Sequence, residues 1–103
     1  MTRTAKAGAL DTARPDYIAI IGFSTGSSFA RGSDALDCIE RVGKIFVSDW
    51  GSLFNVRGRE VKAVLFDVTG IGSCYWEGDL VPVDNDTGEK AKFCKVVTVN
   101  LPK

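Results

Sequence analysis

The alternation of apolar and polar residues along the chain predicts four strands and one helix. Residues 16–23 are apolar at most positions, which is typical of a strand buried on both faces. Residues 59–70, 73–83 and 91–101 place β-branched and aromatic side chains with a period near two, and each predicts a further strand. The strand at 73–83 is expected to be interrupted at residues 77–79. Residues 34–50 instead repeat apolar positions every three or four residues and predict a helix.

The predicted helix is amphipathic and carries signals at both ends. Ser33 is expected to cap its N-terminus and Gly51 to end it. Asp37 precedes Arg41 by four residues, the order that favours an ion pair on a helix. The apolar stripe that should face a sheet comprises Leu36, Ile39, Val42, Gly43, Phe46, Val47 and Trp50.

These elements predict a single α+β domain over residues 15–103, preceded by a flexible tail at residues 1–14. In the order β-α-β-β-β, one amphipathic helix should pack on a four-stranded, mostly antiparallel sheet. Residues 24–33 are small and lack periodicity, so we expect a loop there. Pro82 has no backbone N–H, which favours an edge position for its strand.

One helix covers only one face of such a sheet. The strand at residues 16–23 is apolar on both faces, so a second apolar face would be left in water. We expect a second copy of the chain to cover it, because symmetric self-association is common. The alternative is that the tail and residues 51–59 fold over it.

The absence of histidine from the chain narrows its chemistry more than any motif does. Ser-His and Cys-His nucleophiles and most zinc or copper sites need an imidazole. Residues 22–26 (G-F-S-T-G) match a nucleophile elbow but have no histidine base. Residues 84–89 (D-N-D-T-G-E) begin like a calcium loop, yet Lys95 stands where the chelating glutamate belongs, so an acidic turn is favoured. We expect a non-catalytic protein with no metal and no cofactor.

The charge balance argues against a polyanionic partner. Lys and Arg total 13 and Asp and Glu total 13, which gives a formal net charge of zero. Such a chain has no overall attraction to nucleic acid or to an anionic membrane. The small basic cluster of Arg57, Arg59 and Lys62 leaves weak nucleic-acid binding as an alternative.

Large aromatic residues and one arginine are the candidates for an interface or a ligand site. Aromatic side chains are frequent anchors at interfaces. A small-molecule pocket, or a minor enzyme site, near residues 24–33 is a second alternative to self-association. The candidate residues are Trp50, Tyr75, Trp76, Phe23 and Arg31.

The compartment is inferred from the first residues and from the cysteines. The first fifteen residues lack the apolar core of a signal peptide, so a cytoplasmic location is expected. Cys38, Cys74 and Cys94 are odd in number and far apart in sequence, which favours buried thiols in a reducing compartment over a disulfide.

Taken together, the sequence favours a small, soluble, non-catalytic interaction module that self-associates. Accessory proteins carried by phages or mobile gene cassettes often have this character. The expected partner is a second copy, with a dimer favoured, or an unknown protein. No membrane partner is expected, and the zero net charge disfavours nucleic acid.

Overall fold

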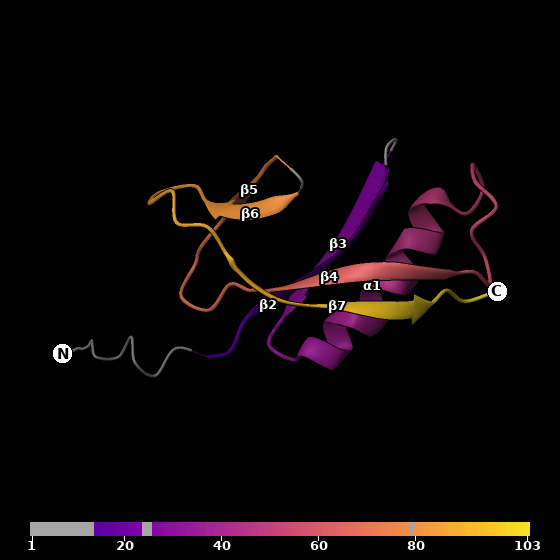
Figure 1. Cartoon of the computed structure of the whole chain (residues 1–103), viewed down its shortest axis with the longest axis horizontal. Coiled ribbons are helices and arrows are strands. Elements are labelled where there is room, and N and C mark those ends of the chain that lie inside the picture. The colour runs from indigo at the N-terminus through magenta and orange to yellow at the C-terminus, as the bar shows by residue number, and fades with distance from the viewer. Residues whose placement is uncertain (1–13, 24–25, 79) are drawn as a thin grey trace.

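A computed structural model of the chain describes residues 14–23, 26–78 and 80–103 (Figure 1). It confirms a single α+β domain with one helix on a four-stranded antiparallel sheet and adds a small second sheet. The tail predicted at residues 1–14 falls outside the described residues except for Arg14. The elements in chain order are β2 (Tyr17–Phe23), β3 (Gly26–Gly32), α1 (Ala35–Trp50), β4 (Glu60–Asp67), β5 (Cys74–Glu77), β6 (Val81–Asp84) and β7 (Lys92–Asn100).

The main sheet has the strand order β3-β2-β4-β7, and every neighbouring pair is antiparallel. Because β3 and β4 both run antiparallel to β2, they are parallel to each other, and α1 connects them across β2. The β4–β7 ladder contains a bulge, since Leu65 pairs with Lys95 and Phe66 with Phe93, which leaves Cys94 as the extra residue.

Two strand predictions are wrong. Residues 26–32, expected in a loop, form β3 along the whole of β2. Ser28 and Ala30 on β3 are buried where β3 packs against α1, and such small residues hide the period of a strand. Residues 73–83, expected as one interrupted strand of the main sheet, form the separate β5–β6 hairpin, which turns at Gly78, within the expected interruption, with a positive φ of 56°.

The helix differs from its prediction at its start and on one side. Asp34, and not Ser33, is the N-cap, and its carboxylate accepts hydrogen bonds from the backbone N–H groups of Leu36 (3.0 Å) and Asp37 (3.3 Å). The predicted Asp37–Arg41 ion pair is confirmed at 2.8 Å. Leu36 is 74% exposed and does not belong to the buried stripe, whose members are Cys38, Val42, Gly43, Phe46 and Val47.

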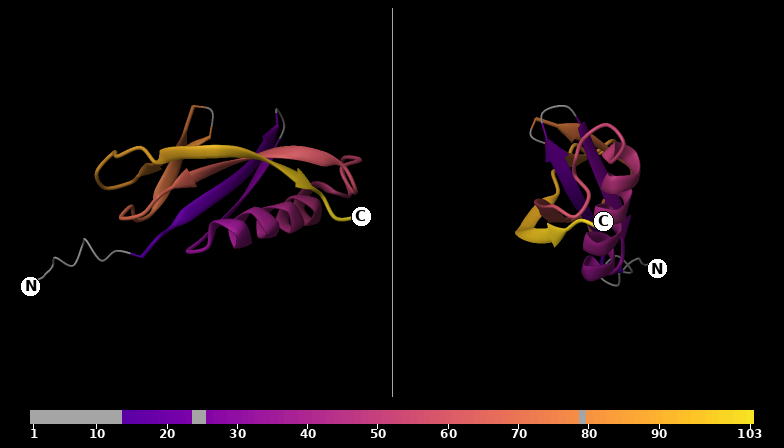
Figure 2. Two further views of the ribbon diagram at one scale, coloured as in Figure 1. Left: turned by 60° about the horizontal axis from the view of Figure 1, so that its bottom comes forward. Right: turned by 90° about the vertical axis from the view of Figure 1, so that its right-hand side faces the viewer.

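Each face of the main sheet has its own apolar core. Under α1 the strands contribute Ala19, Ile21, Ala30, Ala63, Leu65 and Val99. On the opposite face, Ile18, Ile20 and Phe66 pack with Leu80 and Val81 of the β5–β6 hairpin. Figure 2 shows α1 and this hairpin on opposite sides of the sheet. The second face is therefore covered in part by the hairpin, and not by residues 51–59 as the alternative prediction had it.

Asp84 organises the turn after β6. Its buried carboxylate accepts backbone hydrogen bonds from Gly72 (3.1 Å), Asp86 (2.7 Å) and Thr87 (3.1 Å). These bonds hold the pKa of Asp84 below its ordinary value. The carboxylate is thus occupied by the chain itself, as expected for an acidic turn.

The three cysteines are free, but their environments differ. Cys38 is buried, Cys74 is half-buried and Cys94 is exposed, so the expectation of three buried thiols is wrong for Cys94. Within the described ranges, no helix has the length and apolar character needed to cross a membrane.

Candidate functional site

The two edges of the main sheet differ in how their backbone groups are used. At the β3 edge, the indole N–H of Trp50 donates to the carbonyl of Ser27 (3.3 Å), and the guanidinium of Arg41 donates to the carbonyl of Arg31 (2.9 Å). Side chains of α1 therefore occupy outward-facing carbonyls of β3. A further strand could pair with β3 at these two carbonyls only by displacing the α1 side chains.

The β7 edge is open. The N–H of Leu101 donates to the carbonyl of Arg59 (2.8 Å), which directs the backbone of Leu101 toward β4. Backbone direction alternates along an antiparallel strand, so the N–H and C=O groups of Val96, Thr98 and Asn100 point away from β4. No strand among the described residues pairs with β7 on that side.

A groove runs beside this open edge on the α1 side. It has a volume of about 750 Å³ and lies between the N-terminal half of α1 and the end of β7. Gly43 allows the close approach, since an added Cβ would lie 3.0 Å from Val99 Cγ1. Asp37 and Glu40 line the groove, and Lys44 is the cation among its described lining residues.

Exposed apolar side chains follow the opposite face from β3 to β7. Phe29 of β3 packs edge-on against Trp76 of β5, with ring centroids 5.1 Å apart. Phe93 packs in the same manner on Phe66 at 6.3 Å. Phe93 and Val96, both on β7, are 60% and 52% exposed, so this apolar face continues up to the open edge.

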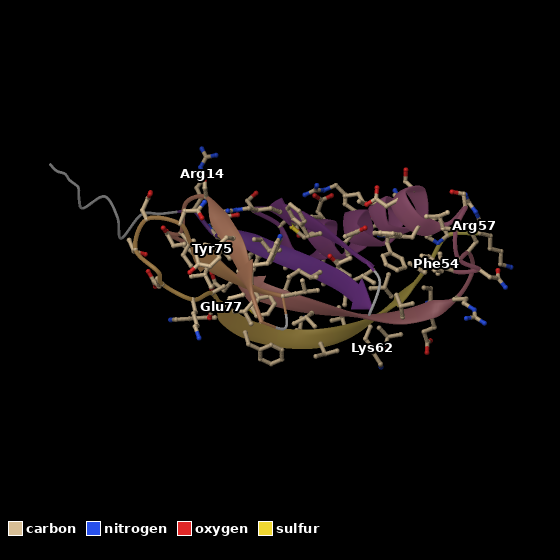
Figure 3. All side chains as sticks on the ribbon, turned by 90° about the horizontal axis from the view of Figure 1, so that it is seen from above. Arg14, Phe54, Arg57, Lys62, Tyr75 and Glu77 are labelled. Atoms are coloured by element: carbon tan, nitrogen blue, oxygen red, sulfur yellow. The ribbon has the colours of Figure 1, made fainter. Side chains whose placement is uncertain are left out.

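The residues predicted for an interface or ligand site do not form one cluster. Trp50 is half-buried at the end of α1, whereas Tyr75 and Trp76 lie on the hairpin. Figure 3 places Tyr75 near one end of the molecule and Phe54, close to Trp50, near the other. The side chain of Phe23 lies outside the described part of the structure.

Arg31 is held by hydrogen bonds to groups of its own chain. Its guanidinium donates to both carboxylate oxygens of Asp16 and to the carbonyls of Ile71 (2.6 Å) and Gly72 (2.8 Å). The hydrogen bond to Asp16 raises the pKa of Arg31. Each of these partners belongs to the chain itself, and they join β3 to the segment that leads into the hairpin.

The basic cluster proposed for nucleic acid is divided. The Lys62 ammonium donates to the hydroxyl of Thr98 on β7 (2.8 Å). Figure 3 shows Lys62 projecting on the β7 side and Arg57 at the end of the molecule. Tyr75, which could have supplied base stacking, lies at the opposite end, so the geometry gives no combined basic and aromatic surface.

A second cavity lies where β2 and β4 diverge. The two strands pair only from Tyr17–Asp67 to Ile20–Val64, and beyond that point the β2–β3 hairpin turns away from β4 (Figure 1). The resulting cleft has a volume of about 520 Å³. None of residues 26–33 lines this cavity or the groove, and residues 24–25 lie outside the described part of the chain.

Sequence reasoning missed both the open edge and the cleft. Lys92 and Lys95 on the last strand are typical of an edge strand and are the signal that could have indicated an edge position for β7. The direction of each backbone N–H depends on the partner strand, and no residue pattern encodes it. In the described part of the chain, no group of His, Cys, Asp and Glu residues is arranged to hold a metal ion.

Comparisons with protein-family models, with curated proteins and with solved structures find no match to this chain.

Proposed function

We propose that the chain is a non-catalytic interaction module that self-associates by antiparallel pairing of β7 with β7 of a second copy. The observation that carries the proposal is the open edge at Val96, Thr98 and Asn100, whereas at the opposite edge side chains of α1 occupy two carbonyls of β3. Unpaired strand edges are ready templates for another strand.

The limits of the regular part of β7 suggest the register. The bulge at Cys94 interrupts the ladder on one side, and Pro102, which has no N–H, ends it on the other. Residues 95–101 lie between them, with Thr98 at the centre. A two-fold axis at Thr98 pairs outward-facing residues of the two copies with each other, as antiparallel hydrogen bonding requires.

Charge complementarity favours a second copy as the occupant. Lys95 pairs with Leu65 of the α1-side core, so it lies on the same side of the sheet as the groove. In the proposed register, Lys95 lies opposite Leu101 of the second copy, beside that copy's groove, which Glu40 lines. The two-fold axis repeats this attraction, which gives two ion-pair contacts for each dimer.

Apolar contacts accompany the pairing on both sides of the sheet. On the α1 side, Val97 meets Val99 of the second copy. On the other side, the exposed Phe93 and Val96 of the two copies lie along the joined strands. Pairing would therefore bring these exposed side chains of the two copies side by side and bury part of their apolar surface along the joined edge.

The mass of the chain in solution, measured by light scattering coupled to gel filtration, tests the proposal with two matched variants. Thr98→Pro removes an outward N–H that β4 does not use, and it should leave a folded monomer. Thr98→Val removes the hydroxyl that Lys62 contacts but keeps the N–H, and it should remain a dimer.

A monomeric wild-type chain up to millimolar concentration would refute self-association. Dimers of unchanged stability for both variants would refute the β7 edge as its location. Circular dichroism of Thr98→Pro verifies that the variant is folded, so that loss of the dimer is not loss of the fold.

A reducing compartment such as the cytoplasm suits this proposal. Cys94 is exposed on β7, next to the segment that pairs. An exposed free thiol at an interface would be prone to disulfide exchange in an oxidising compartment.

A further inference from the structure

The cleft between β2 and β4 presents backbone groups that pair with no strand in the described part of the chain, as well as apolar side chains. The N–H of Val68 donates to the carbonyl of Asp16 (2.8 Å), so the backbone of Asp16 faces β4. Because backbone direction alternates along a strand, every second residue after Asp16 faces the same way, and Gly22 is one of them. The carbonyl of Arg59, the residue before β4, faces β7, so by alternation the backbone of Lys62 on β4 faces β2. The β2–β4 ladder ends at Ile20–Val64, so the backbone of Gly22 and of Lys62 faces the cleft and not a partner strand.

The floor and walls of the cleft are apolar. Ile21 and Phe46 belong to the α1-side core, Val61 packs against it, and Phe54 and Val56 enclose the end of the cleft. A volume of about 520 Å³ lies within the range that holds a small organic molecule.

One cationic side chain is suitably placed at the rim. Arg59 immediately precedes β4, and its side chain lines the cleft. By alternation with Glu60 it projects on the same side as Val61, toward the apolar walls. Its charge is available, since the ion pairs found among the described residues do not involve it. Lys62 instead directs its ammonium to Thr98 on β7, and Glu60 lies on the Lys62 side of the strand.

We infer that this cleft binds a small amphipathic carboxylate, an apolar body with one anionic head. The body occupies the space between Phe46, Phe54 and Val61. The head pairs with the Arg59 guanidinium and accepts a hydrogen bond from a backbone N–H that faces the cleft. The inference is independent of self-association, because the cleft and the open edge of β7 lie on opposite sides of β4.

The test uses decanoate as the probe and decanol as its neutral analogue, followed by amide chemical shifts of the labelled protein. Decanoate should shift the amides of Gly22, Val56 and Lys62 in a saturable way. Decanol should bind about tenfold more weakly, because it lacks the charge that Arg59 recognises. Arg59→Gln should weaken decanoate about tenfold and leave decanol unchanged, whereas Arg57→Gln, two residues away and outside the cleft, should change neither.

Equal affinity for decanoate and decanol would overturn the anionic head. Equal effects of Arg59→Gln and Arg57→Gln would overturn the role of Arg59. Shifts confined to the exposed apolar face around Phe93 and Val96, or saturation of the cleft amides by an extended apolar peptide but not by decanoate, would overturn the site or its ligand class.

Discussion

Arg31 binds Asp16 in a bidentate ion pair, with Nη2 2.7 Å from Oδ2 and Nε 3.2 Å from Oδ1. The same guanidinium donates to the carbonyls of Ile71 and Gly72, which lie 40 and 41 positions further along the chain. One side chain thus ties the end of β3 to the start of β2 and to the segment before β5.

Replacing this arginine should destabilise the fold. Arg31→Ala leaves the Asp16 carboxylate and two carbonyls without their donor, and we expect a loss of about 1–3 kcal/mol in the free energy of unfolding. Urea denaturation measures it. Lys44→Ala, on the exposed side of α1, is the control and should change stability by less than about 0.5 kcal/mol. Equal losses for the two variants would contradict the role of Arg31.

Stability should fall in acid because two carboxylates have lowered pKa values. Three backbone N–H groups lower the pKa of Asp84, and the hydroxyl and N–H of Thr69 lower that of Asp67. In both cases the unfolded chain binds protons at a higher pH than the folded chain does. The stabilisation is therefore complete above about pH 5 and is lost as the pH falls through the folded pKa values.

The measurement is urea denaturation between pH 7 and pH 2. Asp84→Asn should flatten the acid side of the profile, whereas Asp86→Asn, exposed in the same turn, should leave it unchanged. A profile of the same shape for Asp84→Asn and wild type would show that Asp84 does not cause the pH dependence.

Gly70 and Gly72 allow the effect of backbone conformation on stability to be tested apart from the effect of space for a side chain. An added Cβ meets nothing within 4 Å at either Gly70 or Gly72, but only Gly70 has a positive φ, of 82°. Gly70→Ala should cost about 1–2 kcal/mol in the free energy of unfolding, as expected for an L-residue in the left-handed region. Gly72→Ala should be neutral or stabilise by up to about 1 kcal/mol, since it restricts the unfolded chain. Thermal unfolding of both variants measures these changes. A larger loss of stability for Gly72→Ala than for Gly70→Ala would contradict the positive φ at Gly70.

Charge reversal tests the register proposed for the dimer. Lys95→Glu should weaken self-association about tenfold, because the reversed charge would face Glu40 of the second copy. The double variant Lys95→Glu with Glu40→Lys should recover the affinity, since each copy then supplies both reversed charges. Sedimentation equilibrium gives the dissociation constants. Failure of the second change to rescue the first would contradict the Thr98-centred register.

The sequence predicted the elements whose side chains carry a clear period. The strands at β2, β4 and β7 and the helix α1 were predicted within a few residues, because each must bury a face of large apolar groups. β3 was missed for the opposite reason. Its buried positions, Ser28 and Ala30, are small because α1 lies directly over them, and small residues are typical of loops as well.

The functional surfaces were harder to predict. An uncovered sheet face followed from the apolar pattern, but the β5–β6 hairpin fills part of it, and no local signal indicated that residues 73–84 leave the main sheet. The open edge at Thr98 and the cleft beside Gly22 depend on which strands are neighbours and where their pairing stops. Those are long-range properties of the sheet.

Amide hydrogen exchange along β7, followed residue by residue at several protein concentrations, tests the central proposal most directly. Val97 and Val99 direct their N–H groups to β4 and should be protected at every concentration. Val96, Thr98 and Asn100 should exchange quickly in dilute solution and slow together as the protein dimerises. Exchange at these three amides that stays fast while the solution mass doubles would place self-association elsewhere on the molecule and contradict the account.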